Sequence, residues 1–418
     1  MKKFLLITHY TPTKENYNGP SALMYHLLKN RPNSIELKIF TSNKNLAPQR
    51  IINESSANLN ADISYIPLSL RNRILTSNKI AKVFRFLKFH KLSADCYYAL
   101  PASVLKQINL FNPDLIFLYP HTNLTIAQQL SKYKIIACGP DCVSLHYSRL
   151  LRDSFCFKNN IEKNILSQYH KRLMMEKSWN TINNTSLYLV GYTDTQYFNI
   201  INNKEKAFFF PHPHYELKDK IISFNHSPLK ILISGKYDLY TYSDITNLIN
   251  ILENNKLDHS IKDSYSITFL GKKWEKLVHI LKKANYNVSH KLWVDDYVSY
   301  ISQFDIQLFP ISVGSGTKGK VLDALSTGLL CIGSKYAFEN IAVKNGTSCI
   351  MYNNINEIPK ILKYILECKY DCEIIAQNGK NEIRKKHSPL LIINSIMEFY
   401  TNNEYKFEAK DYFKVDLK

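Results

Sequence analysis

Short apolar runs alternate with longer stretches of helical periodicity in the first half of the chain. Residues 4–8 predict a buried strand, and residues 22–30 predict the first helix, with Ser21 as its cap. Alternation of strands with helices is typical of a doubly wound parallel sheet. Further strands are predicted at residues 36–41, 63–66, 115–119, 134–138, 187–191 and 208–211.

The second half of the chain repeats this pattern after a proline-containing polar stretch at residues 211–228, which predicts an interdomain linker. Strands are predicted at residues 230–234, 267–270, 288–293, 306–310 and 330–333. The sequence therefore predicts an α/β protein with two Rossmann-like, doubly wound domains that face a cleft. The expected parts are domains at residues 1–217 and 228–385 and a helical segment at residues 386–418 that packs back toward the N-terminal domain.

A glycine-rich loop connects a predicted strand to a predicted helix at residues 313–328, which read VGSGTKGKVLDALSTG. Free amides at a helix N-terminus bind anions, and the charges of Lys318 and Lys320 add to this attraction. Gly328 is expected to end the helix. The sequence therefore predicts a diphosphate-binding loop. Its expected contacts are Gly314, Ser315, Gly316, Thr317, Lys318 and Lys320.

Two other interpretations of this loop have to be weighed. The spacing of its glycines also fits the dinucleotide fingerprint GxGxxG, which needs an acidic residue after the next strand to bind the ribose. Lys335 stands where that carboxylate is expected, and Glu339 comes only later. A turn that merely packs a helix on a strand is the other alternative, and the two lysines argue against it.

The composition limits the class of protein. A chain of 418 residues is too long for one compact core and suits two domains of about 200 residues. Hydrophobic residues make up 45% of the chain and exclude a disordered protein. The eight cysteines include no CxxC pair, so buried thiols in a reducing cytoplasm are expected. The apolar start at residues 4–7 is too short for a signal peptide, and no long apolar run predicts a membrane span.

The chain has a formal net charge of +19, from 54 Lys and Arg against 35 Asp and Glu. Such a charge attracts nucleic acid, acidic lipid or a phosphorylated substrate, but no nucleic-acid-binding motif is evident. Residues 71–91 combine basic side chains with apolar ones at helical spacing, which predicts either a helix on an anionic membrane surface or an ordinary solvated helix. The basic residues are Arg71, Arg73, Lys79, Lys82, Arg85, Lys88 and Lys91.

The order of elements and residues 307–342, QLFPISVGSGTKGKVLDALSTGLLCIGSKYAFENIA, resemble the GT-B glycosyltransferases, specifically the family 4-like group. The resemblance implies that residues 1–217 bind an acceptor and that residues 228–385 bind a nucleotide sugar. It implies that Asp323, one turn into the helix, binds the ribose hydroxyls. Gly235 and Lys236 resemble the family's second contact to the diphosphate, where a lysine stabilises the leaving group.

The sequence departs from the family pattern at Ser315, which stands where the first of two glutamates is usual. Retention is the family default, and this departure leaves the stereochemical outcome open. In the first domain, Gly19 resembles the glycine loop that approaches donor and acceptor. Asp141 follows a strand at a position where relatives often have histidine, and His121 is its rival as a catalytic group. A capping or loop-fixing role is the alternative for both residues.

Two further expectations concern the base and a metal. Trp293 and Val294 resemble the segment whose backbone meets the base, and we expect the tryptophan side chain to pack in the core. No DxD triplet occurs, so no metal and no other cofactor is expected. Lysines and the helix dipole would neutralise the diphosphate in place of a cation.

The resemblance thus implies an enzyme that moves a sugar from a nucleotide diphosphate to a lipid-linked or oligosaccharide acceptor in cell-surface polysaccharide biosynthesis, such as that of lipopolysaccharide or capsule. The expected location is the cytoplasm, peripheral on the inner face of the plasma membrane. The expected partners are the nucleotide sugar, the acceptor and an anionic membrane surface, without nucleic acid. A GT-B sugar-nucleotide epimerase or hydrolase and a non-catalytic sugar-nucleotide-binding protein are the alternatives.

Overall fold

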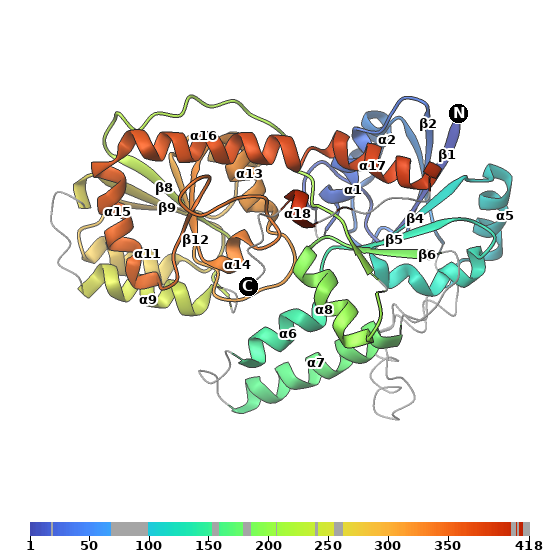
Figure 1. The fold of residues 1–418 in the computed structure, drawn as a ribbon, viewed down its shortest axis with the longest axis horizontal. Coiled ribbons are helices and arrows are strands. Elements are labelled where there is room, and N and C mark those ends of the chain that lie inside the picture. Colours follow the sequence, from blue (N-terminus) through green and yellow to red (C-terminus); the bar gives the residue numbers. More distant parts are fainter. Residues whose placement is uncertain are drawn as a thin grey trace. The chain divides into compact units, whose positions relative to one another are not determined.

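The computed structural model describes residues 1–17, 20–67, 99–152, 159–178, 185–205, 207–238, 241–254, 262–402, 407 and 409–412. Contacts between these residues divide the chain into two compact units. The first unit consists of Met1–Pro213 and Pro389–Ala409, and the second of His214–Ser388 with the described residues from Lys410. Each unit is built around a parallel sheet with helices beside it (Figure 1).

The sheet of the first unit has seven strands in the order β3-β2-β1-β4-β5-β6-β7. Its first strand pairs with both β2 and β4, so the sheet is extended in both directions from there, which is the doubly wound arrangement. The elements are β1 (Lys2–Thr8), α1 (Ala22–Lys29), β2 (Ile35–Thr41), α2 (Gln49–Leu59), β3 (Ala61–Tyr65), α5 (Ala102–Phe111), β4 (Leu115–Tyr119), η2 (His121–Leu130), β5 (Ile135–Gly139), α6 (Val143–Arg152), α7 (Asn159–Ser178), β6 (Thr185–Leu189), α8 (Tyr192–Asn202), β7 (Ala207–Phe209) and α17 (Pro389–Asn402).

Helices cover both faces of this sheet because every second strand residue points to the same side. On one face, α1 and α17 pack against Phe4 and Phe117. On the other face, α5, η2 and α8 pack against Leu5 and Ile116. The strand residues are apolar on both sides, as expected for parallel strands that are buried between two helical layers.

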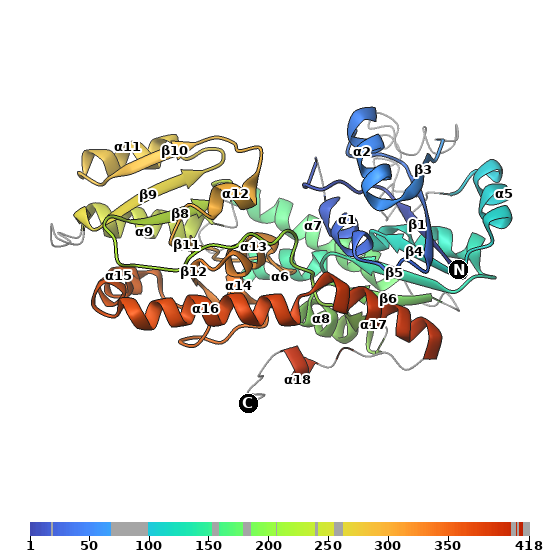
Figure 2. The same ribbon diagram turned by 90° about the horizontal axis from the view of Figure 1, so that it is seen from above.

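The sheet of the second unit has six parallel strands in the order β10-β9-β8-β11-β12-β13, and Figure 2 shows this order from β10 to β12. The order reverses direction between β8 and β11. The elements are β8 (Leu229–Ser234), α9 (Tyr242–Asn254), β9 (Tyr265–Leu270), α11 (Glu275–Lys283), β10 (Val288–Lys291), α12 (Tyr297–Ile301), β11 (Ile306–Phe309), α13 (Gly319–Thr327), β12 (Leu330–Gly333), α14 (Lys335–Phe338), β13 (Ile350–Met351), η4 (Ile355–Glu357), α15 (Ile358–Glu367), α16 (Lys369–Lys386) and α18 (Ala409–Tyr412).

The second sheet also lies between two helical layers. Helices α9, α11 and α15 pack on one face, where Leu248, Leu277 and Leu362 are buried. Helices α12, α13 and α14 pack on the other face. This places the N-terminus of α13 at the carboxyl end of the sheet, directly after β11.

The predicted α/β class with two doubly wound parallel sheets is confirmed, and each predicted strand forms with its ends within two residues of the prediction. β13 was not predicted because its two residues are too few to show a pattern. The expectation that Trp293 packs in the core is wrong, since its side chain is 70% exposed. β10 ends at Lys291, so Trp293 lies beyond the part of the strand that the helices cover.

Two sequence predictions concern residues outside the described part of the chain. They are the glycine loop at Gly19 and the basic segment at residues 71–91. Five of the six described cysteines are buried, in agreement with the prediction of buried thiols. Within the described part, no helix combines the length and the apolar character needed to cross a bilayer.

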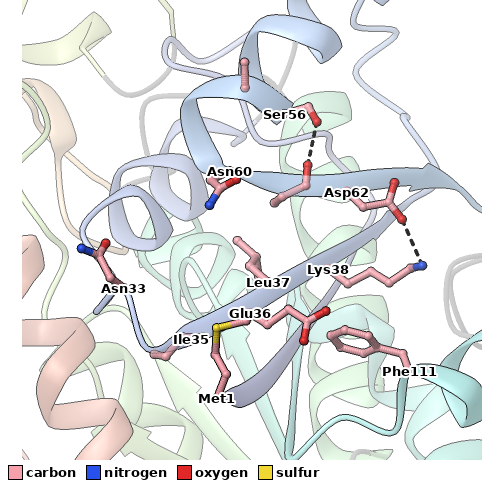
Figure 3. A pocket seen from close by; sticks show the side chains of 12 residues that line it. Met1, Asn33, Ile35, Glu36, Leu37, Lys38, Ser56, Asn60, Asp62 and Phe111 are labelled. Atoms are coloured by element: carbon pink, nitrogen blue, oxygen red, sulfur yellow. Dashed lines mark hydrogen bonds and ion pairs between the residues drawn. The ribbon is translucent and has the colours of Figure 1, made fainter.

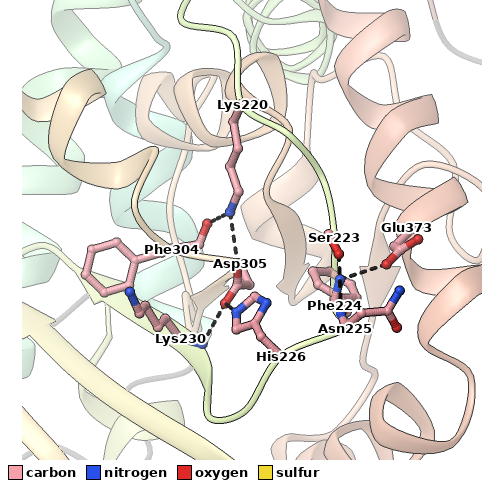
Figure 4. A network of polar contacts seen from close by, with 9 residues as sticks. All are labelled: Lys220, Ser223, Phe224, Asn225, His226, Lys230, Phe304, Asp305 and Glu373. Atoms are coloured by element: carbon pink, nitrogen blue, oxygen red, sulfur yellow. Dashed lines mark hydrogen bonds and ion pairs between the residues drawn. The ribbon is translucent and has the colours of Figure 1, made fainter.

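The predicted linker contains no helix or strand up to β8, yet it is bound tightly to the second sheet through Asp305 (Figure 4). Asp305 is buried at the start of β11, and its carboxylate accepts hydrogen bonds from Lys220 Nζ at 3.2 Å and His226 Nε2 at 2.9 Å. The same carboxylate accepts from the backbone amide of Lys230 at 2.9 Å. Burial lowers the pKa of Lys220, and the charge of Asp305 opposes this shift. The segment before β8 is therefore fixed to the second unit by a buried ion pair.

Candidate functional site

The predicted diphosphate loop lies at the carboxyl ends of β8 and β11, where the strand order of the second sheet changes direction. β11 ends at Phe309, and α13 begins at Gly319. Ligands of doubly wound folds bind outside the carboxyl ends of the strands at such a change of direction. Gly328 ends α13 with a φ of 97°, in the left-handed region that favours glycine, so the predicted helix stop is confirmed.

Lys318 holds the loop in place from within. Its ammonium donates to the backbone oxygens of Ser315 at 2.9 Å and Gly316 at 2.7 Å. Gly316 has a φ of 67°, which allows the backbone to bend back toward this ammonium. Lys318 is also the N-cap residue of α13, and an ammonium cannot accept a hydrogen bond from the first helical amides. Those amides are therefore not capped by the residue that usually caps them, which suits an anion site.

Lys320 and Asp323 lie in the first turns of α13, close to a tyrosine of α12. The Lys320 ammonium lies 5.5 Å from the centre of the Tyr297 ring. Lys320 is exposed as a residue, yet partial desolvation of its ammonium lowers its pKa, and the charge of Asp323 opposes this shift. Asp323 is buried, and its charge also acts on Tyr297. The loop thus brings a cation and a carboxylate together at the start of one helix.

A buried polar network connects Tyr297 to the sheet. Gln307 in β11 is fully buried, and its Nε2 donates to Ser234 Oγ at 2.7 Å and to Tyr297 Oη at 3.0 Å. The two hydroxyls are 2.9 Å apart. Burial raises the pKa of Tyr297, so its hydroxyl stays protonated. Sequence reasoning missed these residues, and the only signal was a glutamine inside an apolar strand.

Gly235 and Lys236 follow β8, the strand next to β11 in the sheet. Gly235 has a φ of 136°, and its backbone oxygen accepts a hydrogen bond from Trp274 Nε1 at 2.9 Å. Lys236 is exposed. Parallel strands leave a sheet at the same edge, so the loops after β8 and β11 are neighbours. The predicted roles of both residues stay predictions.

A polar cavity of about 430 Å³ opens at the same edge of the sheet, beyond the carboxyl ends of β11, β12 and β13. Inside it, Tyr352 Oη donates to Asp244 Oδ2 at 2.8 Å. Burial raises the pKa of Asp244, and the Tyr352 hydroxyl opposes the shift. The lining residues are Asp244, Asn247, Ile311, Ser312, Ser334, Lys335, Tyr336, Tyr352, Asn353, Asn354 and Ile355.

In the first unit, the two predicted catalytic residues have different surroundings. His121 is 3% exposed, and burial lowers its pKa to about 3, with the nearby charge of Arg172 acting in the same direction. Its ring packs against the backbone of Gly139, where an added Cβ would lie 2.2 Å from His121 Nδ1. Asp141 follows β5 and is partly exposed. Both catalytic roles stay predictions. Of the two side chains, Asp141 is the one that solvent reaches, because His121 is buried.

Two buried carboxylates hold the loop that carries Asp141. Glu176 of α7 accepts hydrogen bonds from the Ser144 amide and hydroxyl and from Cys142 Sγ, the last at 3.2 Å. Asp194 of α8 accepts from the Cys142 amide at 2.9 Å. Burial raises the pKa of Glu176, and its hydrogen bonds with Ser144 and Cys142 oppose the shift. Sequence reasoning gave these carboxylates no role because their partners lie more than 30 positions away.

The first unit also has a cavity of about 510 Å³ at the beginning of β2 and β3 (Figure 3). Lys38 and Asp62 line it and form an ion pair, with 3.0 Å between Lys38 Nζ and Asp62 Oδ2. This cavity lies at the amino ends of the strands, the end of the sheet that does not bind ligands in doubly wound folds. We assign no function to it. Its lining residues include Met1, Asn33, Glu36, Lys38, Asn60 and Asp62.

No protein-family model and no curated protein matches the sequence. Solved structures do match over nearly the whole chain. HepE of Anabaena in complex with UDP and glucose is similar with a TM-score of 0.61 and 10% identity, over 95% of this chain and 99% of that chain. Sucrose-phosphate synthase of Thermosynechococcus elongatus is similar with a TM-score of 0.67 and 12% identity, over 96% and 99%.

A third similar structure is WaaG, a glycosyltransferase involved in lipopolysaccharide biosynthesis, with a TM-score of 0.57 and 11% identity over 96% of this chain and 100% of that chain. At such low identities the likeness is evidence for the fold. The two doubly wound sheets and these matches show that the chain has the GT-B fold of glycosyltransferases.

Proposed function

We propose that the protein is a glycosyltransferase that binds a nucleotide diphosphate sugar in its second unit. The observation that carries the proposal is the loop between β11 and α13, which combines a helix start that its N-cap side chain does not cap with Lys320 and the buried Asp323. The amides and Lys320 would bind the diphosphate, and Asp323 would bind the ribose. Lys318 would hold the loop, since its ammonium is bonded to loop carbonyls. HepE, a protein of this fold, is described in complex with UDP and glucose, which supports this choice of ligand.

The chemical step in this proposal is mainly electrostatic. Lys320 and Lys236 would stabilise the charge that develops on the departing diphosphate, without a metal ion or another cofactor. Asp141 would accept the proton of the acceptor hydroxyl, because it is partly exposed. His121 is the weaker candidate, since a buried ring with a lowered pKa takes up a proton with difficulty.

The acceptor in this proposal is a lipid-linked saccharide at the cytoplasmic face of the membrane. WaaG, which shares the fold, is described as a glycosyltransferase involved in lipopolysaccharide biosynthesis, and this supports the choice of acceptor. The basic segment at residues 71–91 would provide the attraction to anionic lipid. Lys82, Arg85 and Lys88 changed together to Glu should release the protein from anionic liposomes, and unchanged binding would remove the membrane from the proposal.

The donor site is tested by thermal stabilisation with UDP-, GDP-, dTDP- and CMP-sugars. A ligand at 100 times its Kd stabilises the folded state by about 2.7 kcal/mol, which raises the melting temperature measurably. One nucleotide should give such a shift, Lys320→Ala and Asp323→Ala should lose it, and Lys360→Ala, an exposed lysine of α15, should keep it. No shift with any nucleotide sugar would contradict the proposal.

Activity is tested by incubation with the bound donor in the presence and absence of saccharide acceptors. A transferase releases nucleotide diphosphate faster when its acceptor is present. Full-rate release of free or altered sugar from donor alone would indicate a hydrolase or an epimerase instead. Donor binding without any turnover would indicate a sugar-nucleotide-binding protein, an outcome that Ser315 in place of the usual glutamate makes worth testing.

A further inference from the structure

The position of Lys320 is explained by the aromatic ring beside it. Its ammonium lies 5.5 Å from the centre of the Tyr297 ring, the first residue of α12. A cation near a tyrosine face is attracted by the negative charge of the π system. A lysine side chain on a surface otherwise samples many rotamers, and binding a ligand then costs conformational entropy. The ring therefore favours one direction of the ammonium before any ligand binds.

The Tyr297 ring is fixed in turn by two strands of the sheet. Its hydroxyl contacts Ser234 at the end of β8 and Gln307 in β11. These strands pair directly with each other. A group that is held by neighbouring strands moves less than one held by a loop, because the sheet is the most rigid part of such a fold.

Gln307 belongs to this network at the expense of stability. Its Oε1 is buried and has no hydrogen-bond partner within the described part of the chain. A buried amide oxygen without a partner disfavours folding, whereas leucine in a strand between two apolar layers does not. Local features that oppose folding are expected mainly at functional sites. Gln307 is therefore better explained by the position of Tyr297 than by the stability of β11.

We infer that Tyr297, held by Ser234 and Gln307, is a positioning residue that directs the Lys320 ammonium toward the donor diphosphate. The inference rests on the proposed donor site and adds a second layer of residues to it. Tyr297 acts through Lys320, and Gln307 acts through Tyr297. Neither side chain needs to touch the donor.

The first test is a double-mutant cycle on UDP affinity, measured by titration calorimetry. Tyr297→Leu should weaken UDP binding roughly 3- to 10-fold, as expected for the loss of a cation–π contact. In the Lys320→Ala background, Tyr297→Leu should change UDP affinity no further, because the residue through which it acts is gone. Losses that multiply in the double variant would overturn the inference.

A second ligand separates positioning from general damage to the site. Lys320 is proposed to meet the phosphates, so Tyr297→Leu should weaken UDP while leaving the affinity for uridine unchanged. An equal loss for UDP and uridine would mean a distorted site and would also overturn the inference. Tyr300→Leu is the matched control, since Tyr300 lies on the same helix but its ring contacts a different lysine. The Lys291 ammonium lies 4.8 Å from the centre of the Tyr300 ring. That control should leave UDP affinity unchanged.

A third variant tests the network against a purely structural role. Gln307→Leu removes the partnerless oxygen, so the melting temperature without ligand should stay equal or rise. The same variant removes one of the two contacts that hold the Tyr297 hydroxyl, so UDP should bind several-fold more weakly. A lower melting temperature together with unchanged UDP affinity would show that Gln307 serves the fold alone. Wild-type protein that binds no nucleotide diphosphate would instead overturn the proposed function and this inference with it.

Discussion

Lys318 and Lys320 are two positions apart, yet their ammonium groups make different contacts. The Lys318 ammonium is bonded to carbonyls of its own loop, whereas the Lys320 ammonium lies over the Tyr297 ring. The sequence predicts both as phosphate ligands because both are basic residues at a helix start. Only the positions of the surrounding atoms distinguish the lysine that bonds to its own loop from the lysine that lies over an aromatic ring.

At the same scale, the raised pKa of Glu176 leads us to expect that the stability of the protein depends on pH. Burial raises its pKa in the folded state, so the folded protein holds the proton more firmly than the unfolded chain. The stabilisation that Glu176 contributes to the folded state is fully present below the ordinary pKa of a glutamate. It is lost as the pH rises through the raised pKa of the folded protein. The free energy of unfolding of the wild type should therefore fall with rising pH relative to that of Glu176→Gln, which stays neutral.

Urea denaturation at a series of pH values from 4 to 8 would measure this difference. Glu367→Gln is the matched control, because Glu367 is an exposed partner of Lys363 in a surface ion pair. The control should follow the wild-type curve. Parallel curves for the wild type and Glu176→Gln would contradict the prediction.

At the scale of elements, α17 belongs to the first unit although it follows the second unit in sequence. Ile392, Ile393 and Ile396 are buried in the core that also contains Phe4 of β1. Ile393→Ala should lower the free energy of unfolding by about 2–5 kcal/mol, the usual result when a buried side chain is truncated. Leu391→Ala, on the same helix but 52% exposed, should have a much smaller effect in the same denaturation experiment.

The second prediction at this scale concerns Asp305. This residue connects the start of β11 to the segment before β8. Asp305→Ala leaves the Lys220 side chain, which is only 11% exposed, without its carboxylate, and this should cost about 3–5 kcal/mol of unfolding free energy. Asp219→Ala is the control, since Asp219 pairs with Lys380 and Arg384 but is 82% exposed. Its loss should be small because solvent screens such pairs. Equal losses of unfolding free energy in the two variants, measured by chemical denaturation, would mean that the Lys220–Asp305 pair stabilises the fold no more than an exposed pair does.

At the scale of the whole molecule, the proposed donor site lies entirely within the second unit. A ligand that binds only the folded state slows amide exchange most where it contacts the protein. UDP should therefore slow hydrogen exchange in residues 234–238 and 312–323, while β4 in the first unit should exchange as before. Hydrogen-exchange mass spectrometry would measure both regions in one sample. Protection confined to the first unit would place the ligand elsewhere.

The sequence by itself determined every strand except β13, their grouping into two sheets and the place of the glycine-rich loop between a strand and a helix. These features depend on local patterns: apolar runs for buried strands, and glycines and lysines between a strand and a helix. Gly328 ended α13 as predicted because a left-handed residue at a helix end is a property of the backbone alone. Such features need no knowledge of which distant side chains meet.

The tertiary structure alone decided which side chains meet at the site and in the loops that support it. Gln307 reaches Ser234 across 73 positions, and Lys220 reaches Asp305 across 85. Trp293 became exposed because its strand ends two residues earlier, which no local pattern indicated. The hydrophobic effect is non-directional and selects which segments pack together, whereas hydrogen bonds and cation–π contacts depend on distances of a few ångströms. Those distances are fixed only once the helices have packed on the sheets.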